Sequence, residues 1–188
     1  MSSSTQICNI ALSKVGGDSI LDLSEDSRSG RICNLVYNDM RQAVLRGHNW
    51  NFAIERVELA QLVAIPAFGF SYQYQLPSDF LKLVGTSYDD YNTVKHRIES
   101  DKLLTNEQTF SIKYIKDVTN EALFDAMFRE VLSTRIAAEI AIFLTDDEPL
   151  HDRMMAEYEF KIGEARSVSS QENTPEGLTA STWINSRI

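Results

Sequence analysis

The sequence predicts an α+β fold that is mainly α: a four-helix bundle with an inserted small antiparallel β lobe and an extended C-terminal tail. In the first and last thirds of the chain, apolar residues recur at three- and four-residue spacing, which indicates amphipathic helices. Between them, apolar and polar residues alternate with a period of two, which is typical of strands. After residue 167 the periodicity ends and small polar residues accumulate. The predicted units are helices 1 and 2 in 1–49, the β lobe in 50–116, helices 3 and 4 in 117–167, and the tail in 168–188.

Two helices are predicted before residue 50. The first runs from Ser4 to Val15 and ends at Gly16. The second is longer; Ser24 is its predicted N-cap, and Gly47 is predicted to end it in a left-handed conformation. Helices joined by so short a turn are expected to pack against each other. The apolar stripe of the second helix consists of Cys33, Val36, Tyr37, Met40 and Val44.

A strand is predicted directly after the second helix, because Trp50, Phe52 and Ile54 alternate with more polar residues. The alternation slips phase between Ile54 and Val57, which predicts a β-bulge or a bend there. A loop is predicted at 63–69 and a turn at Asp89-Asp90. Four further strands of the same small sheet are predicted at 70–76, 81–88, 94–99 and 109–115.

Two more helices are predicted after Asp117. Either Thr119 or Asp125 is expected to cap the third, which runs to Leu144. A break at 145–149 precedes the fourth helix. The tail that follows carries large apolar side chains that a purely solvated segment does not need, so we expect them to anchor a protein partner. The alternative is a disordered tail in which these apolar residues are incidental. These candidate partner-binding residues are Leu178, Trp183, Ile184 and Ile188.

Net charge and the distribution of apolar residues argue against several classes of protein. The net charge of −9 argues against a nucleic-acid-binding protein, which needs a basic face, although it is compatible with a wall that DNA slides past. The start of the chain has no signal-peptide pattern, and no window approaches the ~18 apolar residues of a membrane span. Cys8 and Cys33 are predicted to be buried free thiols, with a disulfide between them as the alternative.

No motif predicts a catalytic, cofactor-binding or metal-binding site. HExxH, CxxC, GxSxG and glycine-rich phosphate loops are all missing from the sequence. The tyrosines Tyr72 and Tyr74 are predicted in the sheet core or a subunit contact. Acidic residues near the sheet loops leave a carboxylate pair open, namely Asp79, Asp89 and Asp90. The histidines lie in three separate predicted elements without a second ligand at metal spacing, and His48 is predicted to be a structural contact beside Trp50; the other two are His96 and His151.

Four segments together resemble a known family. They are ICNIALSKVGG, LSEDSRSGRICNLVYNDMRQAVLRGHNWNFA, YQLPSDFLKL and KYIKDVTNEALFDAMFREVLSTRIAAEIAIFLT. In this order and spacing they resemble the tail tubular protein A group, which comprises the head-to-tail adaptor (gatekeeper) proteins of short-tailed bacteriophages. The most specific pieces are LSEDS, WNFA and YQLP. The similarity runs from about Ile7 to about Ala165 and does not cover the tail.

The resemblance implies a structural protein without enzymatic activity. Adaptors of this kind form a dodecameric ring beneath the portal protein, bind tail and nozzle proteins below, and line the channel through which double-stranded DNA passes without sequence-specific binding. A C-terminal segment grips the portal. The implied location is the head–tail junction of the virion, with assembly in the bacterial cytoplasm and no membrane partner.

Two other functions remain open on the sequence. One is a cell-wall hydrolase carried by the phage particle, which would use a pair of carboxylates. The other is a nucleic-acid-binding protein built on the first two helices. The second helix, however, opens with Glu25 and Asp26, where a DNA reader needs neutral or basic residues.

Overall fold

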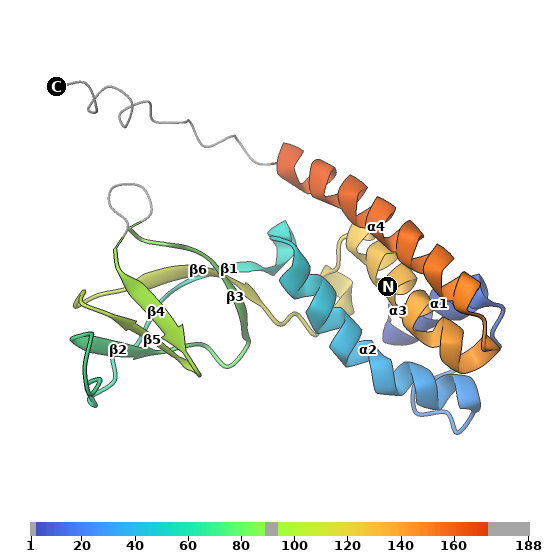
Figure 1. The fold of residues 1–188 in the computed structure, drawn as a ribbon, viewed down its shortest axis with the longest axis horizontal. Helices are drawn as coiled ribbons and strands as arrows, with labels where there is room; N and C mark the ends of the chain where they lie inside the picture. The colour runs from blue at the N-terminus through green and yellow to red at the C-terminus, as the bar shows by residue number, and fades with distance from the viewer. Residues whose placement is uncertain (1–2, 89–93, 173–188) are drawn as a thin grey trace.

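The computed structural model describes residues 3–88 and 94–172, which form an elongated body with helices at one end and strands at the other (Figure 1). A pair of connections, one before the first strand and one after the last, joins the helical part to the β part. In the described residues the elements are α1 (Ser4–Val15), α2 (Arg28–Gly47), the 3-10 turn η1 (Asn51–Ala53), β1 (Ile54–Glu58), β2 (Tyr72–Gln75), β3 (Phe80–Thr86), β4 (His96–Glu99), β5 (Lys102–Thr105), β6 (Ser111–Lys116), η2 (Glu121–Leu123), α3 (Ala126–Thr145) and α4 (Glu148–Gln171).

Local capping explains where the first two helices begin and end. The prediction for α1 is confirmed, with Gly16 in the left-handed conformation at its end (φ 72°). The prediction for α2 is wrong at its start. The Ser24 hydroxyl donates to Asp22, and Ser27 caps the helix by accepting from the Gly30 amide at 3.0 Å. The end of α2 also differs, because the chain leaves the helix at His48 in an extended conformation.

The last two helices meet at a tight corner. Asp125 is the N-cap of α3, as one of the two predicted candidates, and its carboxylate accepts from the Met127 amide at 2.7 Å. Asp146 ends α3 with a positive φ of 53°, and Asp147 immediately caps α4. The fourth helix continues to Gln171, so residues 168–171, which the sequence assigned to the extended tail, are helical.

The prediction of a four-helix bundle with one small β lobe is wrong, because the strands form two separate antiparallel sheets of three strands each. One sheet has the order β1-β6-β3 and the other β2-β5-β4. The second sheet was missed because its central strand, β5, has no alternation. Leu103, Leu104 and Thr105 are all buried there, so the usual polar face is absent.

The start of the β part also differs from its prediction. Residues 51–53 form a 3-10 turn and not a strand, because the Trp50 side chain turns back to the helices, where its indole Nε1 donates to the Val44 carbonyl at 2.9 Å. The strand β1 then pairs with β6 in continuous register, so the predicted bulge is wrong. The register shifts lie instead between β3 and β6. The predicted turn at Asp89-Asp90 lies outside the described residues.

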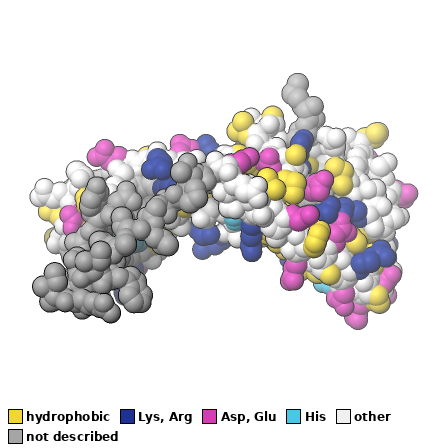
Figure 2. All heavy atoms as spheres, turned by 90° about the horizontal axis from the view of Figure 1, so that it is seen from above, with side chains coloured by type: hydrophobic (Ala, Val, Ile, Leu, Met, Phe, Trp, Pro, Cys, Tyr) yellow, Lys and Arg dark blue, Asp and Glu magenta, His cyan; other side chains and the backbone are white. Residues whose placement is uncertain are grey.

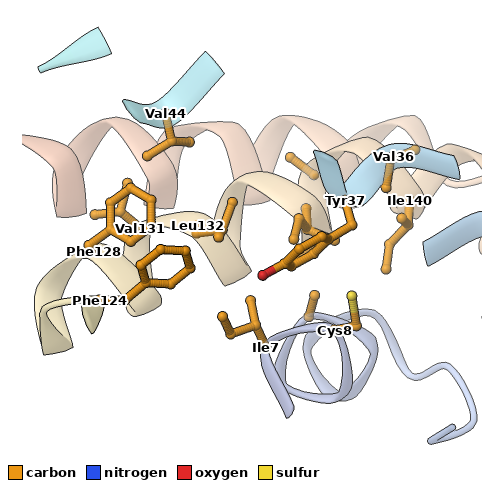
Figure 3. Packing of buried hydrophobic residues seen from close by; sticks show 14 of the residues in the cluster. Ile7, Cys8, Val36, Tyr37, Val44, Phe124, Phe128, Val131, Leu132 and Ile140 are labelled. Atoms are coloured by element: carbon orange, nitrogen blue, oxygen red, sulfur yellow. The ribbon is translucent and has the colours of Figure 1, made fainter. Parts of the chain in front are cut away.

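The helical part and the β part each have a hydrophobic core of their own. In the helical core, Tyr37 of α2 lies beside Ile7 and Cys8 of α1, while Phe124 and Phe128 pack together near the start of α3 (Figure 3). The other core fills the space between the two sheets. It contains Tyr74, which confirms that this tyrosine belongs to the sheet core. Its buried members are Leu59, Tyr74, Leu76, Leu103, Phe110, Ile112 and Tyr114.

The two cysteines are buried free thiols, as predicted. Cys8 of α1 and Cys33 of α2 face each other within the helical core. The pKa of the Cys8 thiol is raised far above its usual range. The largest cause is a hydrogen bond with the Cys33 sulfur, and the second is burial. Both groups therefore serve as small packing residues between α1 and α2.

Helix α2 requires glycine at position 30. A Cβ there would lie 2.4 Å from the Glu25 carbonyl oxygen, closer than any relaxed contact. We expect Gly30→Ala to lower the free energy of unfolding by about 1–3 kcal/mol, because the turn before α2 would have to move. The matched control is Gly163→Ala in α4, where the new methyl group meets open space. It should stabilise by about 0.4–1 kcal/mol. Urea denaturation measures both, and equal effects would contradict this account.

A buried ion pair ties α2 to the segment that leaves β6. The Arg41 guanidinium donates to the Val118 carbonyl and lies 2.8 Å from the Asp117 carboxylate. We expect Arg41→Met to destabilise the protein by about 3–5 kcal/mol, because Asp117 would stay largely buried without its partner. The exposed pair Arg31–Asp26 provides the control, and Arg31→Met should change stability by no more than about 0.5 kcal/mol. Thermal unfolding of both variants tests the difference, which should vanish if burial is irrelevant.

Candidate functional site

The candidate site is the place where α4 ends and the tail begins. The residues predicted to bind a partner, Leu178, Trp183, Ile184 and Ile188, all lie outside the described residues. The structure does describe α4, which ends at Gln171, and its C-cap Glu172. The surface around these two residues is therefore known.

A hollow of about 240 Å³ lies beside the end of α4. Three segments that are distant in the sequence form its walls: the turn η1, the start of α3 and the last turns of α4. Its lining is mainly apolar, with a few polar groups at the rim. The lining residues are Trp50, Asn51, Phe52, Asp125, Met127, Ala165, Val168, Ser169 and Glu172.

Asn51 connects the walls of this hollow. Its side-chain Nδ2 donates to the Ser169 carbonyl at 3.2 Å and to Glu172 Oε2 at 2.8 Å. The residue that leads into the β part thus holds the last turn of α4. The sequence analysis missed this role, because it placed Asn51 on the polar side of a strand, and no local pattern marks a contact to a residue so far along the chain.

Two lining residues of the hollow, Trp50 and Phe52, belong to a cluster of packed aromatic side chains. The ring centroids of Trp50 and Phe128 are 5.0 Å apart at an angle of 83°, and those of Phe52 and Phe128 are 5.0 Å apart at 70°. Phe124 packs edge-on against Phe128 at 4.8 Å. Edge-to-face packing of this kind fixes ring orientation in addition to burying area. The two aromatic residues that line the hollow are therefore held in fixed orientations by their neighbours.

Cations surround the end of α2 next to this site. Arg166 of α4 donates to the Gly47 carbonyl at 3.2 Å, Arg46 donates to the Leu81 carbonyl, and Lys82 donates to Asn49 Oδ1 at 3.1 Å. Cations are favoured at the negative end of a helix dipole. Burial, and then the charges of Arg166 and Lys82, lower the pKa of His48 below its usual value.

His48 is a structural contact, as predicted. Its ring packs edge-on against Trp50 with a centroid separation of 5.1 Å. The other two histidines each lie within hydrogen-bond distance of a backbone carbonyl, His96 with Val94 at 3.1 Å and His151 with Ala138 at 2.8 Å. The three lie in separate regions of the described chain.

The structure describes only one of the three candidate carboxylates, Asp79. Asp79 accepts a hydrogen bond from the Tyr114 hydroxyl at 3.0 Å at the β3 end of the first sheet, while Asp89 and Asp90 lie outside the described residues. Among the residues that the structure describes, no group of three or more His, Cys, Asp or Glu side chains is arranged to hold a metal ion.

A second exposed feature lies at the far end of the β part, away from the helices (Figure 1). Residues 62–70, LVAIPAFGF, connect β1 to β2 and contain no polar side chain. Val63, Ile65 and Phe68 are 102%, 74% and 88% exposed. The sequence analysis predicted a loop here but assigned it no function. The signal was present: a non-periodic stretch without a single polar residue is unusual for a surface loop.

Acidic side chains are concentrated on the helical part (Figure 2). They occupy the loop between α1 and α2 and the corner between α3 and α4, which lie together because Arg28 at the start of α2 donates to the Phe143 carbonyl near the end of α3. None of the helices in 3–88 and 94–172 has the length and apolar character needed to span a membrane.

No protein-family model matches the chain, and no curated protein matches it.

His48 predicts a pH dependence of stability. Its pKa is lowered in the folded protein, so the unfolded chain binds a proton more readily as the pH falls below the ordinary histidine value of about 6.5. Stability should therefore be fully present above that pH and decrease as the pH falls through the folded-state pKa. We expect His48→Gln to flatten the stability profile between about pH 7 and 5 relative to the unmodified protein. Urea denaturation at each pH measures the free energy of unfolding, and His96→Gln is the control. If the stability of His48→Gln fell with pH as steeply as that of the unmodified protein, this assignment would be contradicted.

Proposed function

We propose that this chain is a structural head-to-tail adaptor of a tailed bacteriophage. A dodecameric ring of copies would sit beneath the portal protein, bind tail and nozzle proteins, and let double-stranded DNA pass without sequence-specific contacts. The role requires neither a cofactor nor catalysis. The location proposed is the head–tail junction of the virion, after assembly in the cytoplasm of the host.

The segments that carry the resemblance occupy positions that set the shape of the molecule. WNFA, residues 50–53, forms the turn that joins the helical part to the first sheet. YQLP, residues 74–77, covers the end of β2 and the exit towards β3. LSEDS, residues 23–27, ends at Ser27, the N-cap of α2. All three control how one element leads into the next, which supports a function that depends on shape.

The single observation that carries the proposal is the form of the described body. An elongated two-part molecule presents an exposed apolar loop at the far end of its β part and a hollow beside the last turn of α4. Both features suit contact with other proteins. The acidic helical part also suits a DNA channel, because carboxylates repel phosphate and leave few places for the duplex to adhere.

The tail provides the test. A protein truncated after Glu172 keeps all of α4 and should remain folded, because its described contacts are retained. We expect it to lose binding to portal rings, since it lacks the apolar anchors Trp183 and Ile184. The paired variant Trp183→Ala with Ile184→Ala should weaken binding by about tenfold or more.

The control for these variants is Leu35→Ala, which changes an exposed apolar residue on α2. Titration calorimetry with purified portal rings measures affinity, and negative-stain microscopy shows whether a second ring has formed. Unchanged affinity of the truncated protein for the portal would refute the proposed role of the tail.

A further inference from the structure

The loop of residues 62–70 is an apolar projection with a fixed base. The Leu62 amide donates to the Gln73 carbonyl at 2.9 Å, and Gly69 completes the return with a left-handed φ of 83°. Between these points the side chains of Val63, Ile65 and Phe68 extend into solvent. Because solvent exposure of large apolar groups is unfavourable, such a loop is normally covered in the functional state of a protein.

A hollow lies directly beside this projection. Its volume is about 550 Å³, within the range of roughly 300–1,000 Å³ typical of pockets that accept bulky groups. One wall is the loop itself from Pro66 to Phe70, and the others come from Gln73 of β2 and from residues 95–104, which include β4 and β5. Phe70 and Leu104 provide apolar surface within it.

The rim of the hollow carries charges of both signs. Lys95, with its ammonium group 5.5 Å from the centre of the Phe70 ring, and Lys102 form no ion pair within the described residues. Glu99 and Asp101 lie on the same rim, with Glu99 in a loose, exposed pair with Arg97 at 3.6 Å. A projection next to a hollow, and cations next to carboxylates, are the features that a self-complementary surface needs.

The distribution of charge favours a second copy as the partner. Two chains with a net charge of −9 repel each other unless their acidic regions stay apart. The loop lies at the end of the β part that is far from the loop between α1 and α2 and the corner between α3 and α4 (Figure 1), and the hollow is lined by this loop and by residues of β2, β4 and β5. Contact through the β ends would separate the acidic regions by more than the screening length of about 8–10 Å. The exposed acidic residues concerned are Asp18, Asp22, Asp26, Asp146, Asp147, Glu148 and Asp152.

We propose that the loop 62–70 of one copy docks in the hollow of a second copy, and that the free protein forms a two-fold symmetric dimer through its β ends. A two-fold contact does not propagate around a ring. The dimer is therefore a form of the protein that precedes assembly, in which the loop is covered until copies separate and join the ring. This inference goes beyond the proposed adaptor function and does not depend on the tail.

Sedimentation equilibrium of the full chain across the micromolar range tests the proposal. We expect a reversible monomer–dimer equilibrium that Phe68→Ser shifts towards monomer by about tenfold or more, because an aromatic side chain that fills a partner's pocket dominates such contacts. Ile65→Ser should act in the same direction. Both residues are exposed, so circular dichroism should show an unchanged fold. The matched control is Leu35→Ser on α2, where the leucine is 73% exposed and lies outside the loop.

A cross-linking experiment tests the geometry. Ala67→Cys places a thiol on the loop and Ser100→Cys places one on the rim of the hollow, while the native Cys8 and Cys33 are buried. Mixing the two variants under a glutathione redox buffer should join two different copies through one disulfide, and each variant alone should give less product. This result, together with the sensitivity to Phe68→Ser, would support the dimer.

Several results would overturn the proposal. These are a monomer at all concentrations, a dimer that is insensitive to Phe68→Ser and Ile65→Ser, an equal loss with Leu35→Ser, or a closed ring that depends on Phe68, which would show a contact between unlike surfaces. None of these results bears on the affinity of the tail for the portal, so failure of the dimer and failure of the adaptor function are distinguishable.

Discussion

The structure depends on the burial of Trp50 at the boundary between its two parts. The indole is almost completely buried, donates to the last turns of α2 and packs against Phe128 of α3, although it belongs to the segment that leads into the first strand. This places the start of β1 against the helical core. The buried pair of Arg41 and Asp117 does the same where the chain returns from β6. The segments that lead into and out of the β part are thus both fixed against the helices, so the two parts are held together at both connections.

In this arrangement, the residues that stabilise the fold differ from those that are exposed for contact with other proteins. The helical core and the core between the sheets each bury their own apolar side chains, and each is continuous without help from another chain. The exposed features, namely the loop 62–70 and the end of α4, lie at the margins of these cores. Changes at the contact surfaces should therefore leave folding intact. Such independence is expected of a protein that meets several partners in succession, because each surface is then free to serve a different contact.

The distribution of charge adds a constraint on assembly. Exposed carboxylates gather at the loop between α1 and α2 and at the corner between α3 and α4, cations surround the end of α2, and the rim beside the apolar loop carries charges of both signs. Copies of so acidic a chain associate only where apolar burial outweighs their repulsion or where opposite charges face each other. In the proposed ring, the helical surfaces would face DNA without holding it, while the β end would be free for protein contacts.

The sequence by itself determined the helices and most strands, because their signals are local. Asp125, one of the two predicted candidates, caps α3, and the alternation around Tyr74 and Tyr114 marks half-buried strands. It also indicated two buried thiols and a structural role for His48. Only the tertiary structure decided that the strands form two sheets. The strand β5 is buried on both faces, so its residues do not alternate between apolar and polar. Only its pairing with β2 and β4 identifies it as a strand. The same holds for the hollow at α4 and for Asn51, because contacts between residues more than a hundred positions apart leave no trace in the local pattern.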